Sequence, residues 1–193
     1  MTSSLIPAGG TLTAGQGQGQ LSQYYGYADG SPTTVTAASA NNLSTVYTIP
    51  AGEAYAGAAY ELSCGGTGTW GSTQQQLTFA MALNGSSFGS AGAGKVAATA
   101  LAASASFFWS AAYELTSVDG VSSWNCKLTV IVAEGASAAN PGTAATNTIP
   151  LAVMLNHTAT VSSSITVALQ ALWASTTGAP TITNSMTRFR KTA

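Results

Sequence analysis

Alternation of apolar and polar residues with a period of two recurs in eight segments after residue 33. Successive side chains of a β-strand point to opposite faces, so this pattern predicts strands with one buried face. The apolar positions are Leu43, Tyr47 and Ile49; Tyr60, Leu62 and Cys64; Leu77, Phe79, Met81 and Leu83; Phe107, Trp109, Ala111, Tyr113 and Leu115; Trp124, Cys126, Leu128, Val130 and Val132; Leu151, Val153 and Leu155; Ile165, Val167, Leu169, Ala171 and Trp173; and Ile182 and Met186.

Turn residues separate these segments, as at Asn84-Gly85 and Asp119-Gly120, and no segment has the period of an amphipathic helix. The Ala-rich residues 93–105 suit a short helix or an irregular loop. About eight antiparallel strands separated by turn residues predict an all-β, two-sheet sandwich. Long connections that cross from one sheet to the other favour the jelly-roll type. We expect this domain to span residues 33–193.

Residues 1–32 form a separate region that contains "GQGQGQ" and "QYYGY" and has no apolar periodicity. We expect an extended N-terminal arm. Two interpretations remain open. The arm either lies on a partner surface, with Tyr24, Tyr25 and Tyr27 as anchors, or folds back on its own domain.

Charged residues make up only 6% of the chain, against about 25% in an average soluble domain, whereas hydrophobic residues make up 46%. With so few charges, electrostatic repulsion between copies of the chain is weak. Such a surface is typical of a protein packed in an assembly. The net charge is −1, and only Arg188, Arg190 and Lys191 form a basic cluster. Nucleic-acid binding neutralises many phosphates, so we expect no nucleic-acid partner.

The N-terminus lacks the basic and apolar regions of a signal peptide, and no apolar run reaches about 18 residues. We therefore expect that the protein does not associate with a membrane and that it is synthesised in a cytoplasm. In that compartment Cys64 and Cys126 are expected to be buried thiols rather than a disulfide.

The sequence "AAYEL" occurs twice, with Glu61 in the first copy and Glu114 in the second. In each copy a turn, a tryptophan and an "LT" strand come next, which predicts one β-hairpin used twice. Both glutamates are expected to point away from the core. The alternative is a glycosidase pair, which would need both carboxylates on one sheet face or in one cleft and a raised pKa on one of them.

The sequence supports other catalytic sites even less, and we predict no catalytic residues, no metal ligands and no cofactor. The single histidine, His157, has no acidic neighbour in sequence, and a nucleophile-elbow motif is absent. Trp70 and Trp124 fall near turns. They are expected to pack at an end of the sandwich or at a subunit contact, and the alternative is a platform that stacks on sugars.

The strand segments resemble the jelly-roll structural proteins of tailed bacteriophage particles, found as head decorations, head fibres and tail-fibre tips. The resembling stretches span residues 44–190 and include "STVYTIPAG", "AAYELSCGGTGT", "QLTFAMALNG", "FFWSAAYELTSVDG", "NCKLTVIV" and "SSSITVALQALWAS". The resemblance implies a non-enzymatic virion protein, commonly a homotrimer, that is made in the host cytoplasm.

Two roles in the particle are implied by the resemblance. The first is a capsid decoration or minor capsid protein that attaches to the major capsid protein through the arm and stabilises the shell. The alternative is a receptor-binding module that recognises host-surface glycans with Trp70 or Trp124. The absence of coiled-coil heptads favours decoration.

Overall fold

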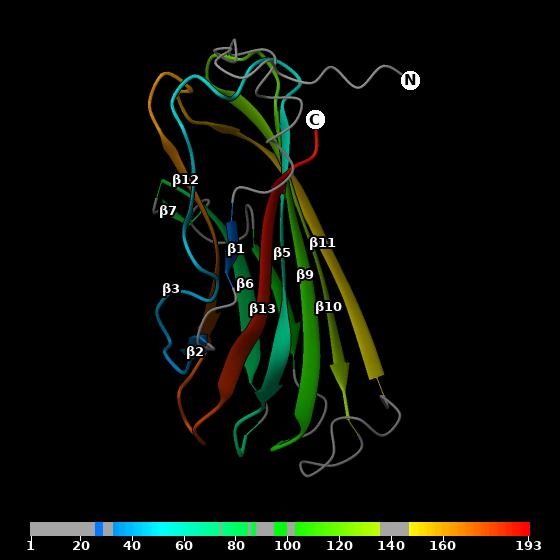
Figure 1. Ribbon diagram of the computed structural model, residues 1–193. Coiled ribbons are helices and arrows are strands. Elements are labelled where there is room, and N and C mark those ends of the chain that lie inside the picture. Colours follow the sequence, from blue (N-terminus) through cyan, green and yellow to red (C-terminus); the bar gives the residue numbers. More distant parts are fainter. Residues whose placement is uncertain are drawn as a thin grey trace, which may run out of the picture.

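The computed structural model describes residues 26–28, 33–73, 75–84, 86–87, 95–99, 103–135 and 147–193. Within these residues the chain forms β-strands and no helix. The strands lie in two antiparallel sheets packed face to face, as Figure 1 shows. The predicted all-β, two-sheet sandwich is confirmed.

Sheet A is the seven-stranded sheet. Its strands, in spatial order, are β1 (Gly26–Ala28), β13 (Thr181–Lys191), β5 (Ala59–Thr69), β9 (Ser106–Ser117), β10 (Ser123–Glu134) and β11 (Asn147–Thr158), with β2 (Thr33–Val35) also paired to β13. Its long strands run side by side from β13 to β11 in Figure 1.

Sheet B is the six-stranded sheet. Its strands, in spatial order, are β3 (Asn41–Asn42), β12 (Ile165–Trp173), β6 (Gln76–Leu83) and β7 (Ser86–Ser87), with β4 (Tyr47–Ile49) also paired to β12 and β8 (Lys95–Thr99) to β6. Each of the eight segments predicted from periodicity contains a strand.

The core lies between the two sheets and is rich in large aromatic side chains. Trp70 packs against Phe107 and Trp173, with ring centroids 4.7 and 5.5 Å apart. Most buried indole N–H groups find backbone acceptors, although that of Trp70 has none: Trp124 donates to Ala159 O at 2.8 Å and Trp173 to Val35 O at 3.0 Å. Burial of each such side chain contributes roughly 1.5–3 kcal/mol, and these hydrogen bonds remove the cost of burying the polar ends.

Residues 93–105 were expected to form a helix or a loop, and this expectation is wrong for residues 95–99, which form β8. Val96 and Ala98 are buried while Ala97 is exposed, so the segment has a strand's period of two. Pairing with β6 places Val96 and Ala98 on the inner face of sheet B, and tertiary context thus overrides helix propensity.

The two "AAYEL" copies lead into different structures. The second copy leads into a hairpin, because β9 and β10 pair along their whole length. The first copy does not: β5 lies in sheet A and β6 in sheet B. Trp70 lies at this crossing and is buried between the sheets, so the chain changes sheet where the hairpin was predicted to turn.

The β9–β10 turn is built around Asp119 and Gly120, as the sequence predicts. The carboxylate of Asp119 accepts hydrogen bonds from the backbone N–H groups of Val121, Ser122 and Ser123 at 2.8–2.9 Å. The bond from Ser123 is the largest influence and, with the others, lowers the pKa of Asp119 to about 2. Gly120 has a φ of +68°, which other residues rarely adopt.

One inward position was predicted wrongly. Met186 was placed on the same face as Ile182, but its side chain is 61% exposed while Ile182 is fully buried. The pairing of β13 with β5 shifts register between Asn184 and Met186. Such a bulge changes which face the following residues occupy, and Phe189 is the next large buried side chain.

Gly66 lies where β13 approaches β5 most closely. A Cβ at this position would lie 2.0 Å from the backbone oxygen of Thr183, next to the bulge. Gly66→Ala is therefore expected to destabilise the fold by about 1–3 kcal/mol, because backbone atoms must shift to admit a methyl group. Equilibrium denaturant unfolding measures the effect.

Gly65→Ala is the matched control for this prediction. The nearest heavy atom to a Cβ at Gly65 is Trp109 O at 3.3 Å, so this variant is expected to lose less stability. Equal losses in the two variants would show that the close approach at Gly66 does not limit the fold.

Candidate functional site

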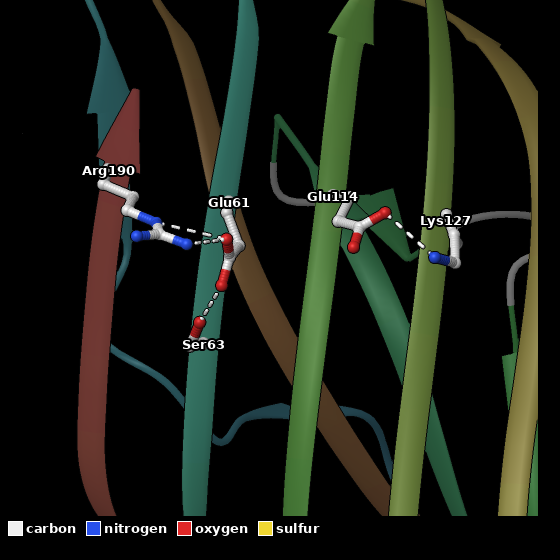
Figure 2. Close-up of polar contacts among 5 residues, drawn as sticks. All are labelled: Glu61, Ser63, Glu114, Lys127 and Arg190. Atoms are coloured by element: carbon white, nitrogen blue, oxygen red, sulfur yellow. Dashed lines mark hydrogen bonds and ion pairs between the residues drawn. The ribbon is translucent and has the colours of Figure 1, made fainter. Parts of the chain in front are cut away.

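The outer face of sheet A, which points away from sheet B, carries a row of four charged residues from four neighbouring strands. Glu61 on β5 is the direct register partner of Glu114 on β9. Arg190 on β13 is the partner of Glu61, and Lys127 on β10 is the partner of Glu114. The order across the sheet is therefore positive, negative, negative, positive (Figure 2).

Each glutamate contacts the cation on its own side. Arg190 donates to Oε2 of Glu61 from Nε at 3.1 Å and from Nη2 at 2.5 Å. Lys127 Nζ donates to Oε2 of Glu114 at 3.1 Å. Ser63 donates its hydroxyl proton to the second carboxylate oxygen of Glu61. These contacts compensate for placing two like charges directly opposite each other, which otherwise destabilises a sheet.

The hydrogen bond from Ser63 is the largest influence on the pKa of Glu61 and lowers it. Burial opposes this shift, and the hydrogen bond and positive charge of Arg190 then help to lower the pKa. A depressed folded-state pKa contributes stability that is present above the unfolded value of 4.5 and is lost as the pH falls through the folded pKa. Because Arg190 is more than one-third exposed, we expect the pair to contribute less than about 1 kcal/mol.

The prediction that both glutamates point away from the core is confirmed, since their strand neighbours Tyr60, Leu62, Tyr113 and Leu115 are the residues buried in it. The structure also brings the two carboxylates to one face, which is one requirement of the glycosidase alternative. The other requirement is a carboxyl group with a raised pKa, and Glu61 has the opposite shift. The row fits a structural charge network better than an acid–base pair.

Arg190→Gln is expected to raise the pKa of Glu61, because it removes a positive charge and two charge-assisted hydrogen bonds. A titration of the side-chain carboxyl carbon followed by NMR measures this pKa. Lys127→Gln is the control and should leave the pKa of Glu61 almost unchanged, since Lys127 contacts Glu114. If the two variants shift the pKa of Glu61 equally, the contact with Arg190 is not what lowers it.

The same outer face exposes a group of large apolar side chains beyond the charged row. Phe108, Ile131 and Met186 are 42%, 43% and 61% exposed, and we call these three residues the outer-face patch. Ile131 pairs with Ser110 and is thus diagonal to Phe108. The Met186 side chain lies 3.5 Å from where a Cβ of Gly65 would be, so it extends over this glycine toward β9.

Trp70 and Trp124 do not form a sugar-stacking platform. Their exposed fractions are 1% and 0%, so neither ring face is available to a ligand. Both fall near chain turns, as predicted, but the turns fold the indoles into the space between the sheets. Both indoles belong to the hydrophobic core between the sheets.

Of the three arm tyrosines, only Tyr27 falls within the described residues. It belongs to β1, and its partner in the ladder is Arg188 of β13. Residues 26–28 therefore fold back on their own domain as an edge of sheet A. Tyr24 and Tyr25, together with the rest of residues 1–25 and residues 29–32, lie outside the described residues.

The remaining candidates are His157 and the potential metal ligands. His157 lies on β11 opposite Trp124, and partial burial lowers its pKa. No group of three or more potential metal ligands occurs among the residues that the structure describes. The same residues contain no helix long and apolar enough to cross a membrane.

Cys64 and Cys126 are free and buried, as predicted. Burial raises the pKa of the Cys64 thiol to about 12 and that of Cys126 to about 11. The thiolate is the reactive form, so both groups are held in an unreactive state at neutral pH.

Neither cysteine is expected to react with an aromatic disulfide reagent in the folded protein at pH 8, and both should react once the chain is unfolded in denaturant. Absorbance of the released thiolate counts the reactive groups. A rapid reaction of one thiol in the folded protein would contradict the burial of that cysteine.

No protein-family profile, curated protein or solved structure matches this chain.

Proposed function

We propose that this protein is a non-enzymatic structural protein of a tailed bacteriophage particle, a capsid decoration or minor capsid protein that attaches to the shell and stabilises it. The jelly-roll strand order and a trimeric state, both implied by the resemblance of residues 44–190, belong to this proposal. The major capsid protein is the proposed partner.

The outer-face patch is the observation that carries the proposal. Phe108, Ile131 and Met186 lie exposed on the outer face of sheet A, where the charged residues of the described strands are the row from Arg190 to Lys127 and Arg188 on β13. Large exposed apolar groups rimmed by polar residues are typical of protein interaction sites. An enzyme would instead need convergent titratable groups in a cleft, and the paired carboxylates are already held by cations.

Attachment of this kind stabilises a shell by mass action. A protein that binds the assembled lattice but not free subunits lowers the free energy of the assembled state by an amount that grows with its concentration. The low surface charge suits this role because it permits close packing of many copies. The burial of Trp70 and Trp124 removes the residues on which a glycan-binding role was based.

The test uses particles of the encoding phage produced without this protein, incubated with the purified chain and separated by sedimentation. Ile131→Lys should reduce binding at least tenfold, because burying an unpaired lysine costs more than about 1.4 kcal/mol. Val46→Lys is the matched control, since Val46 has a similar exposure of 46% and lies outside sheet A. Removal of residues 1–25 tests the arm while keeping β1 and β2.

Binding that is lost in Ile131→Lys or in the arm deletion and kept in Val46→Lys supports the proposal. No sedimentation of the wild-type chain with particles overturns it. Binding to host cells that free sugar competes away would favour the receptor-binding alternative, with a site other than Trp70 and Trp124.

A further inference from the structure

The strand β11 is a long open edge of sheet A. It extends over twelve residues, Asn147–Thr158, and pairs with β10 along its whole length. Among the described residues no strand pairs with its other side. In Figure 1 it is the last strand of the sheet, on the side opposite β1 and β2.

The hydrogen bonds to β10 show in which direction each residue of β11 points its backbone N–H and C=O groups. Ala159, which opposes Ser122 just beyond the strand, donates its N–H to Ser122 O at 2.8 Å. Paired residues in an antiparallel ladder alternate, so the odd-numbered residues of β11 direct their N–H and C=O groups toward β10. The even-numbered residues Ala152, Met154 and Asn156 direct theirs toward the open side. The backbone of Pro150 is also directed toward the open side. A proline fits there because β10 needs no N–H from this position.

In the part of the chain that the structure describes, Pro150 near the start of β11 is the one feature of this strand that hinders pairing with another chain. Charged residues, short strands and bulges protect most sheet edges. The sequence of β11, "NTIPLAVMLNHT", has no lysine, arginine, aspartate or glutamate. The opposite edge is protected: β1 and β2 have three residues each, and β13 has a bulge and three cations near its end.

The side chains of β11 are incompletely covered. Met154 is 73% exposed and is the most exposed large apolar residue of the described chain. Leu151 and Val153 face the core but are only partly buried, whereas the inward residues Leu128 and Val130 of β10 are fully buried. A further strand beside β11 would complete the cover over these positions.

We propose that β11 pairs with β11 of a second copy of this chain, in an antiparallel ladder with two-fold symmetry. Met154 lies opposite Met154 of the second copy, and Ala152 lies opposite Asn156 of the second copy. The residues directed toward the other chain are then even-numbered on both strands, so their N–H and C=O groups lie opposite each other and can form hydrogen bonds. Sheet A becomes one continuous sheet across two copies.

Charge favours a second copy as the occupant. Identical strands bring identical charges together, and β11 has none to repel. Two charged residues of β10 are register partners of β11: Glu134 lies opposite Asn147 at the end of the ladder, and Lys127 lies opposite Met154 and is already paired with Glu114. In the paired sheet the two Lys127 residues would stand three strand spacings apart, about 14 Å, which is beyond the Debye length at physiological salt.

The test measures the mass of the full chain by sedimentation equilibrium over a range of concentrations. Met154→Lys should halve the mass of the wild-type assembly, because it places two ammonium groups opposite each other at the centre of the ladder. The mass falls from dimer to monomer or, where the copies also form the proposed trimer, from hexamer to trimer. Ala152→Pro should do the same, since it removes an N–H that faces the second copy and none that faces β10. Met186→Lys is the matched control: it makes the same change at another exposed position of sheet A and should leave the mass unchanged.

Hydrogen exchange gives a second readout that a general loss of stability would not imitate. The amides of Ala152, Met154 and Asn156 should exchange more slowly as the wild-type concentration rises, while the amide of Val153, directed toward β10, stays protected throughout. A wild-type chain that remains monomeric overturns the inference. So does an assembly, trimeric or otherwise, whose mass Met154→Lys leaves unchanged, and either result leaves the particle-binding proposal to its own test.

Discussion

Burial of the inner faces of the two sheets against each other is the interaction on which the rest of the structure depends. The inward positions of the long strands carry tryptophan, tyrosine, phenylalanine and leucine, and the largest of them, including Trp70, Trp124 and Trp173, are almost completely buried. With 6% charged residues, the chain has few ion pairs to add to this burial. Indole and backbone groups satisfy one another across the core, so aromatic packing can be dense without leaving most polar ends unpaired.

Because alternate residues of each strand are buried between the sheets, the remaining residues are fixed on the outer face of sheet A. The repeated "AAYEL" strands pair directly, so Glu61 and Glu114 stand opposite each other, and Arg190 and Lys127 balance them from the flanking strands. The outer-face patch lies on the same side, and β11 ends the sheet with an uncharged edge. The proposed shell contact and the proposed pairing of copies therefore use different parts of one sheet, and they do not compete for the same residues.

Several features of the site were not predictable from alternation alone. Glu134 is charged but only 2% exposed, because it continues the inward phase of β10 to the end of the strand. Met186 faces outward because a bulge in β13 shifts its phase. Trp70 and Trp124 are near turns in sequence, and only the direction in which the chain folds back decides that they are buried rather than exposed. The pairing of the two glutamates required knowledge of which strands are neighbours.

The sequence by itself determined the strand class, the eight principal strands, most of the inward residues and the buried state of both cysteines, since these depend on local periodicity and on the transfer of apolar side chains from water. The tertiary structure decided which strands are neighbours, where the chain crosses from one sheet to the other, and which strand ends sheet A among the described residues. These features depend on contacts between residues far apart in the chain, such as β5 with β9 and with β13, and a period of two carries no information about partners.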